Sequence, residues 1–165
     1  MTCLFELSIA LLITLLNGFF VMAEYSLVRI RKSRLDELIR QGKSRASTVL
    51  KMSEKLDTYL SATQLGITAS SLLLGWFGGP LLAEMFRGMF GISAGSWYDH
   101  SLVFACAFLI IVFLHVVFGE LVPRTIALGK VEQVAMAVAY PLVFFHYLLY
   151  PLVVLFNRIA HAVLC

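Results

Sequence analysis

The stretch LVFACAFLIIVFLHVVFGELVP, residues 102–123, decides what kind of protein this chain can be. It holds one histidine and one glutamate among apolar or small residues, and as a helix it is long enough to cross about 30 Å of hydrocarbon. The whole chain is similar: 60% of its 165 residues are hydrophobic, 14% are charged and the mean hydropathy is +0.88. A chain of this size cannot bury that much apolar surface in its own core. The sequence therefore predicts an all-α integral membrane protein.

Four apolar runs are long enough to be candidate spans: residues 5–25, 59–82, 102–122 and 134–156. In the last run, Pro141 and Pro151 each remove a backbone hydrogen-bond donor and crowd the preceding turn. This pattern favours a kinked or re-entrant helical segment over a straight span. We therefore expect three transmembrane helices plus a bent helical hairpin on the cytoplasmic side, and four full spans stay an alternative.

Basic residues concentrate between the first two runs, because nine of the thirteen Lys and Arg residues lie in residues 29–57. The positive-inside rule makes this segment cytoplasmic and places the N-terminus outside. Apolar residues recur there at steps of three and four, which predicts an amphipathic juxtamembrane helix or helix pair interrupted near Gly42. We expect its basic face to lie against the lipid headgroups of the bilayer.

Several function classes have no signature in this chain. A nucleic-acid partner is not expected, since no basic cluster is interleaved with exposed aromatic residues on a polar surface. The cysteines, Cys3, Cys106 and Cys165, are far apart and lack the spacing of a zinc site. No nucleophile–base arrangement, H-E-x-x-H motif or phosphate-binding loop is recognisable. We therefore expect that the chain is not an enzyme.

Polar residues inside apolar runs are costly in lipid and are functional candidates for that reason. In the third run, Pro123 has no N–H, so the carbonyl of Gly119 loses its helical partner. This carbonyl and the adjacent carboxylate of Glu120 supply two oxygen ligands at one place, as in the broken helices of transporters. The alternative is that Glu120 pairs with Arg124 where the helix ends. His115 is interpreted as an interhelical hydrogen-bonding residue rather than a ligand.

The first two runs hold further candidates. Asn17 and Glu24 lie two helical turns apart and share a face. Asn17 is expected to meet another helix. Glu24 either is a site residue or pairs with Arg29. Oxygen-bearing and small residues form a stripe along the second run, with two more beside it: Gln64, Thr68, Ser71 and Gly75, then Thr63 and Ser70. Such a stripe allows close helix packing, and its oxygens also suit a hard cation.

Three stretches of the chain resemble the transmembrane domain of the CorC/CNNM family of magnesium transporters, in its bacterial haemolysin-C-like subgroup. They are NGFFVMAEYSL at 17–27, TQLGIT at 63–68 and FGELVP at 118–123. The resemblance implies a transmembrane domain over residues 1–165, with cytoplasmic juxtamembrane helices at 29–57 and a kinked segment at 134–156. It also implies a homodimer in the bacterial inner membrane and a cytoplasmic CBS region in full-length proteins, which is absent here.

The resemblance further implies export of Mg²⁺, with Na⁺ as a candidate coupling ion, through an intramembrane site centred on Glu120. The expected oxygen ligands are Glu120, the Gly119 carbonyl, Ser70, Ser71, Asn17 and Glu24. Val21 and Ile67 stand where other members carry Ser and Asn, so the exact ligand set stays open, and Ser70 and Ser71 are expected to replace the missing oxygens. Two alternatives remain: a non-transporting membrane scaffold whose polar stripe only joins helices, and an exporter of another cation.

Overall fold

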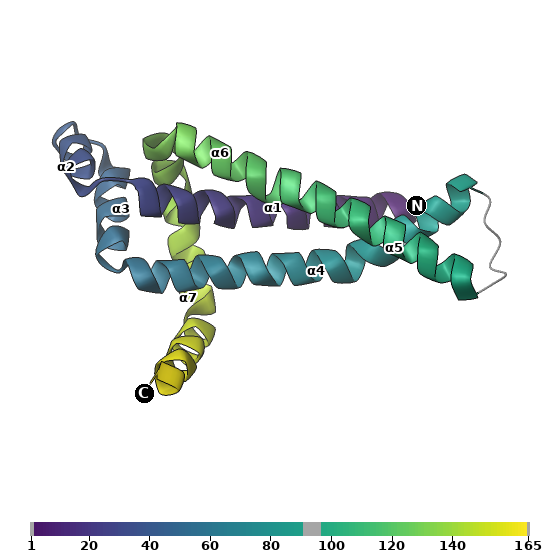
Figure 1. The fold of residues 1–165 in the computed structure, drawn as a ribbon. Coiled ribbons are helices and arrows are strands. Elements are labelled where there is room, and N and C mark those ends of the chain that lie inside the picture. Colours follow the sequence, from purple (N-terminus) through teal and green to yellow (C-terminus); the bar gives the residue numbers. More distant parts are fainter. Residues whose placement is uncertain (1, 91–96, 165) are drawn as a thin grey trace. The chain divides into compact units, whose positions relative to one another are not determined.

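The computed structural model describes residues 2–90 and 97–164, and all regular structure in these ranges is helical. A π-helical segment, η1 (His115–Leu121), joins α5 to α6 (Figure 1). The helices in chain order are α1 (Thr2–Arg29), α2 (Lys32–Arg40), α3 (Ser44–Glu54), α4 (Leu56–Phe90), α5 (Trp97–Leu114), α6 (Val122–Gly129) and α7 (Val131–Leu164). The prediction of an all-α fold is confirmed.

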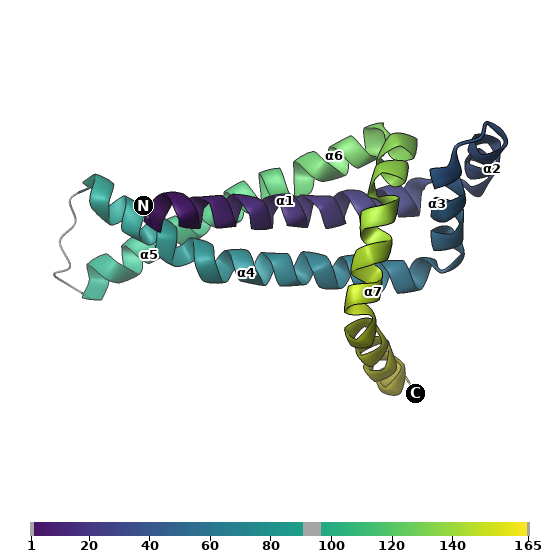
Figure 2. The same cartoon turned by 180° about the vertical axis from the view of Figure 1, so that it is seen from behind.

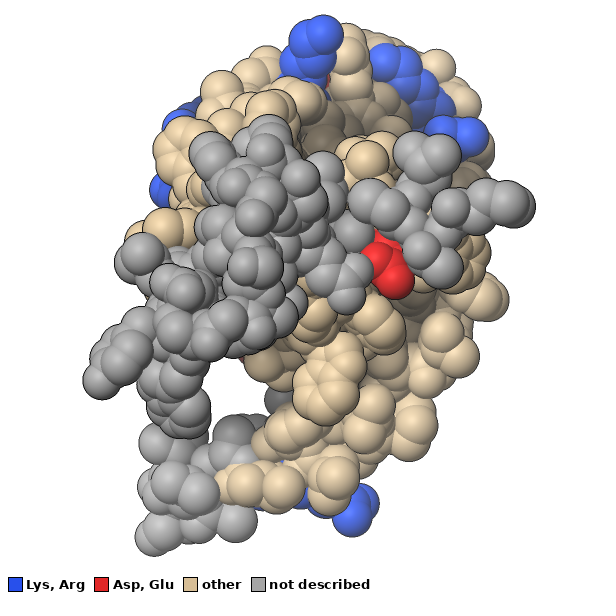
Figure 3. Space-filling model, turned by 90° about the vertical axis from the view of Figure 1, so that its right-hand side faces the viewer, with Lys and Arg blue, Asp and Glu red and all other residues tan. Residues whose placement is uncertain are grey.

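Three described helical stretches are long and apolar enough to cross a membrane: Phe5–Arg29, Phe108–Gly129 and Val131–Phe156. The first two contain most of the predicted runs 5–25 and 102–122. The predicted run 59–82 lies within α4, a single helix of 35 residues. Figure 3 shows one face of the molecule, on which most of the described surface is uncharged and Lys and Arg appear at the edge. The chain is a multi-pass membrane protein.

The chain divides into two compact units, each built from segments far apart in the sequence. The first unit comprises Met1–Gly18 and Thr68–Val122, so it holds the start of α1, most of α4, α5 and η1. The second unit comprises Phe19–Ile67 and Pro123–Cys165, which adds α2, α3, α6 and α7 to the remaining parts of α1 and α4. Helices α1 and α4 therefore contribute to both units.

The core of the first unit joins α1, α4 and α5 through the buried side chains of Ile13, Leu74 and Ile111. Gly78 permits this close approach, because a Cβ atom at that position would lie 2.8 Å from Cδ1 of Ile111. A cavity of about 280 Å³ lies in this unit, and its lining is aliphatic and aromatic except for Thr14 and His115.

The buried face of α4 differs from the predicted polar stripe. Buried residues recur every four positions along the helix, at Ala62, Gly66, Ser70, Leu74 and Gly78. Of the predicted stripe, Gln64, Thr68 and Gly75 are exposed and Ser71 is half-buried. The physical reason is that small residues at four-residue steps let neighbouring helices approach closely, whereas a hydroxyl can be satisfied within its own helix.

Helices α2 and α3 confirm the predicted amphipathic helix pair interrupted near Gly42. Gly42 has φ +81°, a left-handed conformation that glycine adopts without strain. Its N–H donates to the carbonyl of Ile39, and the N–H of Lys43 donates to that of Leu38. These two bonds form a Schellman motif that ends α2. The apolar faces of the pair are buried at Leu35, Leu38, Ala46, Val49 and Met52.

Helix α7 continues through Pro141 and Pro151 as one helix of 34 residues, so its described residues do not form two arms of a hairpin. Each proline removes only one hydrogen bond, and ten residues separate them, which leaves enough bonds to keep the helix continuous. Figures 1 and 2 show α7 crossing the segments of α1 and α4 in its own unit instead of running alongside them. Its Phe145 ring packs 5.2 Å from the ring of Phe20 and 5.8 Å from that of Phe19.

Candidate metal centre

A buried hydrogen bond joins Asn17 of α1 to Gly119 of η1 within the first unit. Nδ2 of Asn17 donates to the Gly119 carbonyl over 2.8 Å. The Asn17 side chain is 1% exposed, and its Oδ1 is buried with no hydrogen-bond partner among the described residues. An unsatisfied buried acceptor costs about 1–3 kcal/mol. This oxygen is therefore suited to contact a bound group that replaces its lost hydrogen bonds to water.

The π-helical geometry of η1 explains why the Gly119 carbonyl is available to another helix. Pro123 has no N–H to donate to it, as the sequence predicts. At the end of η1 the N–H of Val122 donates to the carbonyl of Val117, five residues earlier, which is the wide π-helical spacing. The Gly119 carbonyl takes its hydrogen bond from Asn17 instead. A carbonyl oxygen has two lone pairs, so one acceptor position remains.

His115 and Ser71 extend this polar cluster. Oγ of Ser71, on α4, and Nε2 of His115 are hydrogen-bonded at 3.1 Å, which confirms the interpretation of His115 as an interhelical residue. The other ring nitrogen, Nδ1, is buried without a hydrogen-bond partner among the described residues. A Cβ atom on Gly119 would lie 3.0 Å from this Nδ1 and 3.2 Å from Nδ2 of Asn17. A side chain at this position would therefore crowd both residues.

The remaining predicted ligands have different environments. Glu120 follows Gly119 on η1 and is exposed, whereas Ser70 on α4 is buried. Arg124, the alternative partner of Glu120, has its guanidinium 4.6 Å from the ring centre of Tyr25. Glu24 belongs to the second unit, where its Oε2 lies 3.5 Å from Oγ1 of Thr63.

The structure thus brings some of the predicted ligands together and leaves others apart. Asn17 and Gly119 are in direct contact, and Ser71 reaches the same cluster through His115. The described residues contain no group of three or more His, Cys, Asp and Glu side chains that could hold a metal. Most atoms of the cluster that could coordinate a metal are neutral oxygens, which suit a hard cation. Sequence reasoning missed the free ring nitrogen of His115, since a histidine in an apolar run does not reveal which nitrogen is satisfied.

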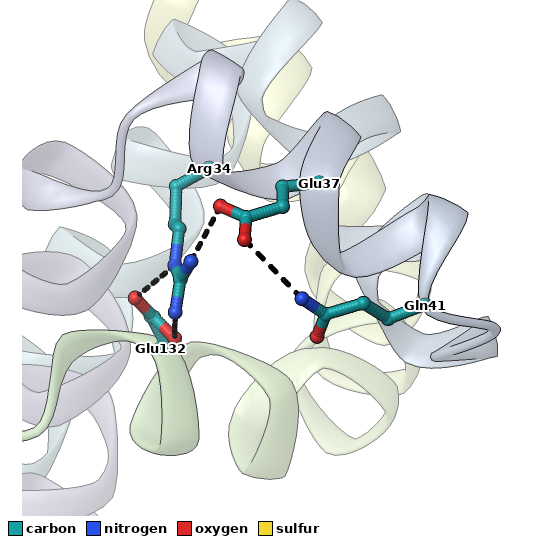
Figure 4. A network of polar contacts seen from close by, with 4 residues as sticks. All are labelled: Arg34, Glu37, Gln41 and Glu132. Atoms are coloured by element: carbon teal, nitrogen blue, oxygen red, sulfur yellow. Dashed lines mark hydrogen bonds and ion pairs between the residues drawn. The ribbon is translucent and has the colours of Figure 1, made fainter.

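A second polar network lies in the second unit and connects α2 to the first turn of α7 (Figure 4). Nε of Arg34 donates to Oε1 of Glu132 at 2.6 Å, and Nη2 donates to Oε2 at 3.3 Å. Arg34 also binds Glu37, which accepts a hydrogen bond from Gln41. The hydrogen bond to Glu132, followed by that to Glu37, raises the pKa of Arg34 above its ordinary value. The three guanidinium nitrogens of Arg34 and the carboxylate oxygens of Glu37 and Glu132 all have partners in this network, so it reads as a structural link between helices.

The sequence matches the description "Cyclin M transmembrane N-terminal domain" over residues 7–165. It is similar to UPF0053 protein YugS of Bacillus subtilis, with 41% identity over 143 residues, covering 86% of this chain and 33% of YugS. UPF0053 protein YhdP of the same organism is 42% identical over 153 residues, covering 92% of this chain and 34% of YhdP. An uncharacterized protein of Mycobacterium tuberculosis is 38% identical over 156 residues, covering 94% of this chain and 44% of that protein. The chain therefore spans about a third to under half the length of these relatives.

Proposed function

Because the chain belongs to the family of the cyclin M transmembrane N-terminal domain, we propose that it is the membrane part of a cation transporter whose cargo is Mg²⁺. The observation that supports this proposal best is the buried, unpartnered Oδ1 of Asn17 beside the Gly119 carbonyl. Mg²⁺ prefers oxygen ligands and usually keeps several of its waters. A small set of neutral oxygens therefore binds it weakly enough for release.

The proposed ligands are Oδ1 of Asn17, the second lone pair of the Gly119 carbonyl and the hydroxyl of Ser71. Glu120 supplies the negative charge next to Gly119, and its exposed carboxylate can rotate toward an arriving cation. Ser70 is buried on the same helix as Ser71 and contributes a further hydroxyl. Glu24, with Thr63, forms a separate pair of oxygens in the second unit, and we propose it as a second oxygen site for the ion.

We further propose that transport is export across a bacterial inner membrane, with Na⁺ as the coupling ion and a homodimer as the working form. The concentration of Lys and Arg in residues 29–57 supports a cytoplasmic location for α2 and α3, and hence an N-terminus on the outside.

Thermal unfolding of the detergent-purified chain across a Mg²⁺ titration tests the proposal. A cation that binds only the folded state stabilises it by about 2.7 kcal/mol at a hundredfold excess over Kd. We expect a saturable shift that is lost in Asn17→Leu, which removes the amide oxygen. Ser26→Ala is the matched control: Ser26 is also buried on α1, but its hydroxyl donates to the carbonyl of Ala23 in its own helix. This control should keep the shift.

Three outcomes would each overturn part or all of the proposal. A Mg²⁺ shift of unchanged size and midpoint in Asn17→Leu would remove Asn17 from the site. The scaffold alternative would be supported by two results together. The parent chain would show no saturable shift, and Asn17→Leu would lose the same stability with and without Mg²⁺. A shift produced by another divalent cation and not by Mg²⁺ would support an exporter of that ion.

A further inference from the structure

His115 is the first residue of η1 and has one satisfied and one unsatisfied ring nitrogen. Its Nε2 is hydrogen-bonded to Oγ of Ser71, while its Nδ1 is buried with no partner among the described residues. A histidine that binds a metal generally uses one nitrogen for the metal and donates from the other to an oxygen. In the tautomer whose proton is on Nε2, that nitrogen donates to Ser71 and Nδ1 carries a free lone pair. The ring is thus oriented as a ligand.

The His115 ring lies next to Gly119 and the amide group of Asn17, two parts of the candidate metal centre. A single point, the position that a Cβ of Gly119 would take, is 3.0 Å from Nδ1 of His115 and 3.2 Å from Nδ2 of Asn17. The imidazole and the amide therefore converge on the same side of Gly119, whose carbonyl Asn17 also contacts. Two buried atoms without a hydrogen-bond partner among the described residues, Oδ1 of Asn17 and Nδ1 of His115, thus belong to neighbouring side chains.

Burial of a ring nitrogen does not by itself identify a metal ligand, as a second histidine shows. His146 also has a buried Nδ1 with no hydrogen-bond partner among the described residues. Its ring stacks on Tyr59 at 4.6 Å, and the rings of Tyr147 and Tyr150 lie 5.8 Å away. Aromatic rings surround His146, whereas the Asn17 amide and the Ser71 hydroxyl lie beside His115. The polar neighbours distinguish the two residues.

We propose that Nδ1 of His115 is a direct ligand of the cation bound by Asn17 and Gly119. This inference rests on the proposed function and extends it to ion selectivity. Imidazole nitrogen binds first-row transition metals well and Mg²⁺ and Ca²⁺ poorly. Mn²⁺ accepts both nitrogen and oxygen ligands and has a size close to that of Mg²⁺. The mixed ligand set therefore binds Mn²⁺ more tightly than Mg²⁺. The same set disfavours Ca²⁺, which takes six to eight oxygens.

Pulsed electron paramagnetic resonance of bound Mn²⁺ tests this assignment directly. The full chain is labelled with ¹⁵N-histidine, purified in detergent and loaded with Mn²⁺, and the hyperfine coupling of a coordinated nitrogen is recorded. We expect a ¹⁵N coupling in the parent chain, its loss in His115→Gln and its retention in His146→Gln. Addition of Mg²⁺ should displace the Mn²⁺ and remove the signal, which shows that both ions use one site.

Affinity measurements separate a ligand role from a merely structural one. Loss of the nitrogen should weaken Mn²⁺ binding on the order of tenfold and Mg²⁺ binding much less, so that the ratio of the two dissociation constants falls. An equal loss for both ions in His115→Gln would contradict a ligand role. Ser71→Ala keeps the imidazole, so it should retain a ¹⁵N coupling even if affinity drops.

The outcomes distinguish this inference from the proposed function. Mn²⁺ that Mg²⁺ displaces, but without any ¹⁵N coupling, would overturn the role of His115 and leave the cation site in place. A coupling that disappears in His146→Gln and persists in His115→Gln would also overturn it. If no Mn²⁺ binds, or if Mg²⁺ does not displace the bound Mn²⁺, the proposed function itself is refuted.

Discussion

Gly119 limits how the side chains of the candidate metal centre are arranged, because a side chain at position 119 would compete for space with Asn17 and His115. In Gly119→Ala the new Cβ would crowd both Nδ1 of His115 and Nδ2 of Asn17, at 3.0 and 3.2 Å. Each of these contacts is tighter than ordinary van der Waals contact, so at least one side chain must move. The present arrangement of the Asn17 and His115 side chains therefore depends on the absence of a Cβ atom at position 119.

We expect Gly119→Ala to lose most of the Mg²⁺-dependent stabilisation while the chain still folds. The measurement is the thermal unfolding titration used for Asn17. Gly129→Ala is the control, since a Cβ there meets nothing within 4 Å, and replacing a helical glycine by alanine stabilises by up to about 1 kcal/mol. An undiminished Mg²⁺ response in Gly119→Ala would show that the cation does not bind between Asn17 and His115.

At the scale of helices, contact between α1 and α4 in the second unit depends on Gly66. A Cβ at Gly66 would lie 2.6 Å from three carbons of the Phe20 ring, which is 2% exposed. The ring cannot move freely, because it also packs edge-on against Phe145 of α7 at 5.2 Å. Three helices thus meet at one aromatic ring, and the small residue of α4 makes this possible.

We expect Gly66→Ala to destabilise the chain by about 1–3 kcal/mol, the usual cost of overpacking a buried site. Gly75→Ala lies on the same helix with nothing within 4 Å of the new Cβ, so it should leave stability unchanged or slightly higher. Thermal unfolding without added cation compares the two variants. Equal midpoints would mean that α1 and α4 are not packed closely at this position.

At the scale of the whole molecule, the course of α7 determines how often the chain crosses the bilayer. Its residues Val131–Phe156 are apolar and long enough to span. In its unit, however, α7 crosses α1 and α4 instead of following them (Figure 2). Since α1 is proposed to cross the membrane, α7 is expected to lie close to the membrane plane on the cytoplasmic side. Both of its ends then face the cytoplasm.

Cysteine labelling in a background without Cys3, Cys106 and Cys165 tests this topology. We expect Gln41→Cys, in the turn after α2, and Arg158→Cys, near the end of α7, to react with a membrane-impermeant maleimide only after the cells are permeabilised. A cysteine added ahead of Met1 should react in intact cells and serves as the external control. Labelling of Arg158→Cys in intact cells would instead support four full spans.

Local chemistry was sufficient to predict much of the architecture and part of the candidate site. Composition and run length identify a helical membrane protein, because the cost of exposing backbone polar groups to lipid leaves few alternatives. The break at Gly42 and the release of the Gly119 carbonyl by Pro123 likewise follow from properties of one or two residues. No partner from elsewhere in the chain is needed for these conclusions.

Contacts between distant residues could not be read in the same way. The bond from Asn17 to Gly119 joins positions 102 residues apart, and the buried face of α4 is defined by Gly66, Ser70 and Leu74 rather than by the predicted polar stripe. Small residues permit close approach on several faces of a helix, so the face that is buried depends on which side chains the neighbouring helices present. For the same reason, the free nitrogen of His115 became visible only once Ser71 was seen to occupy the other.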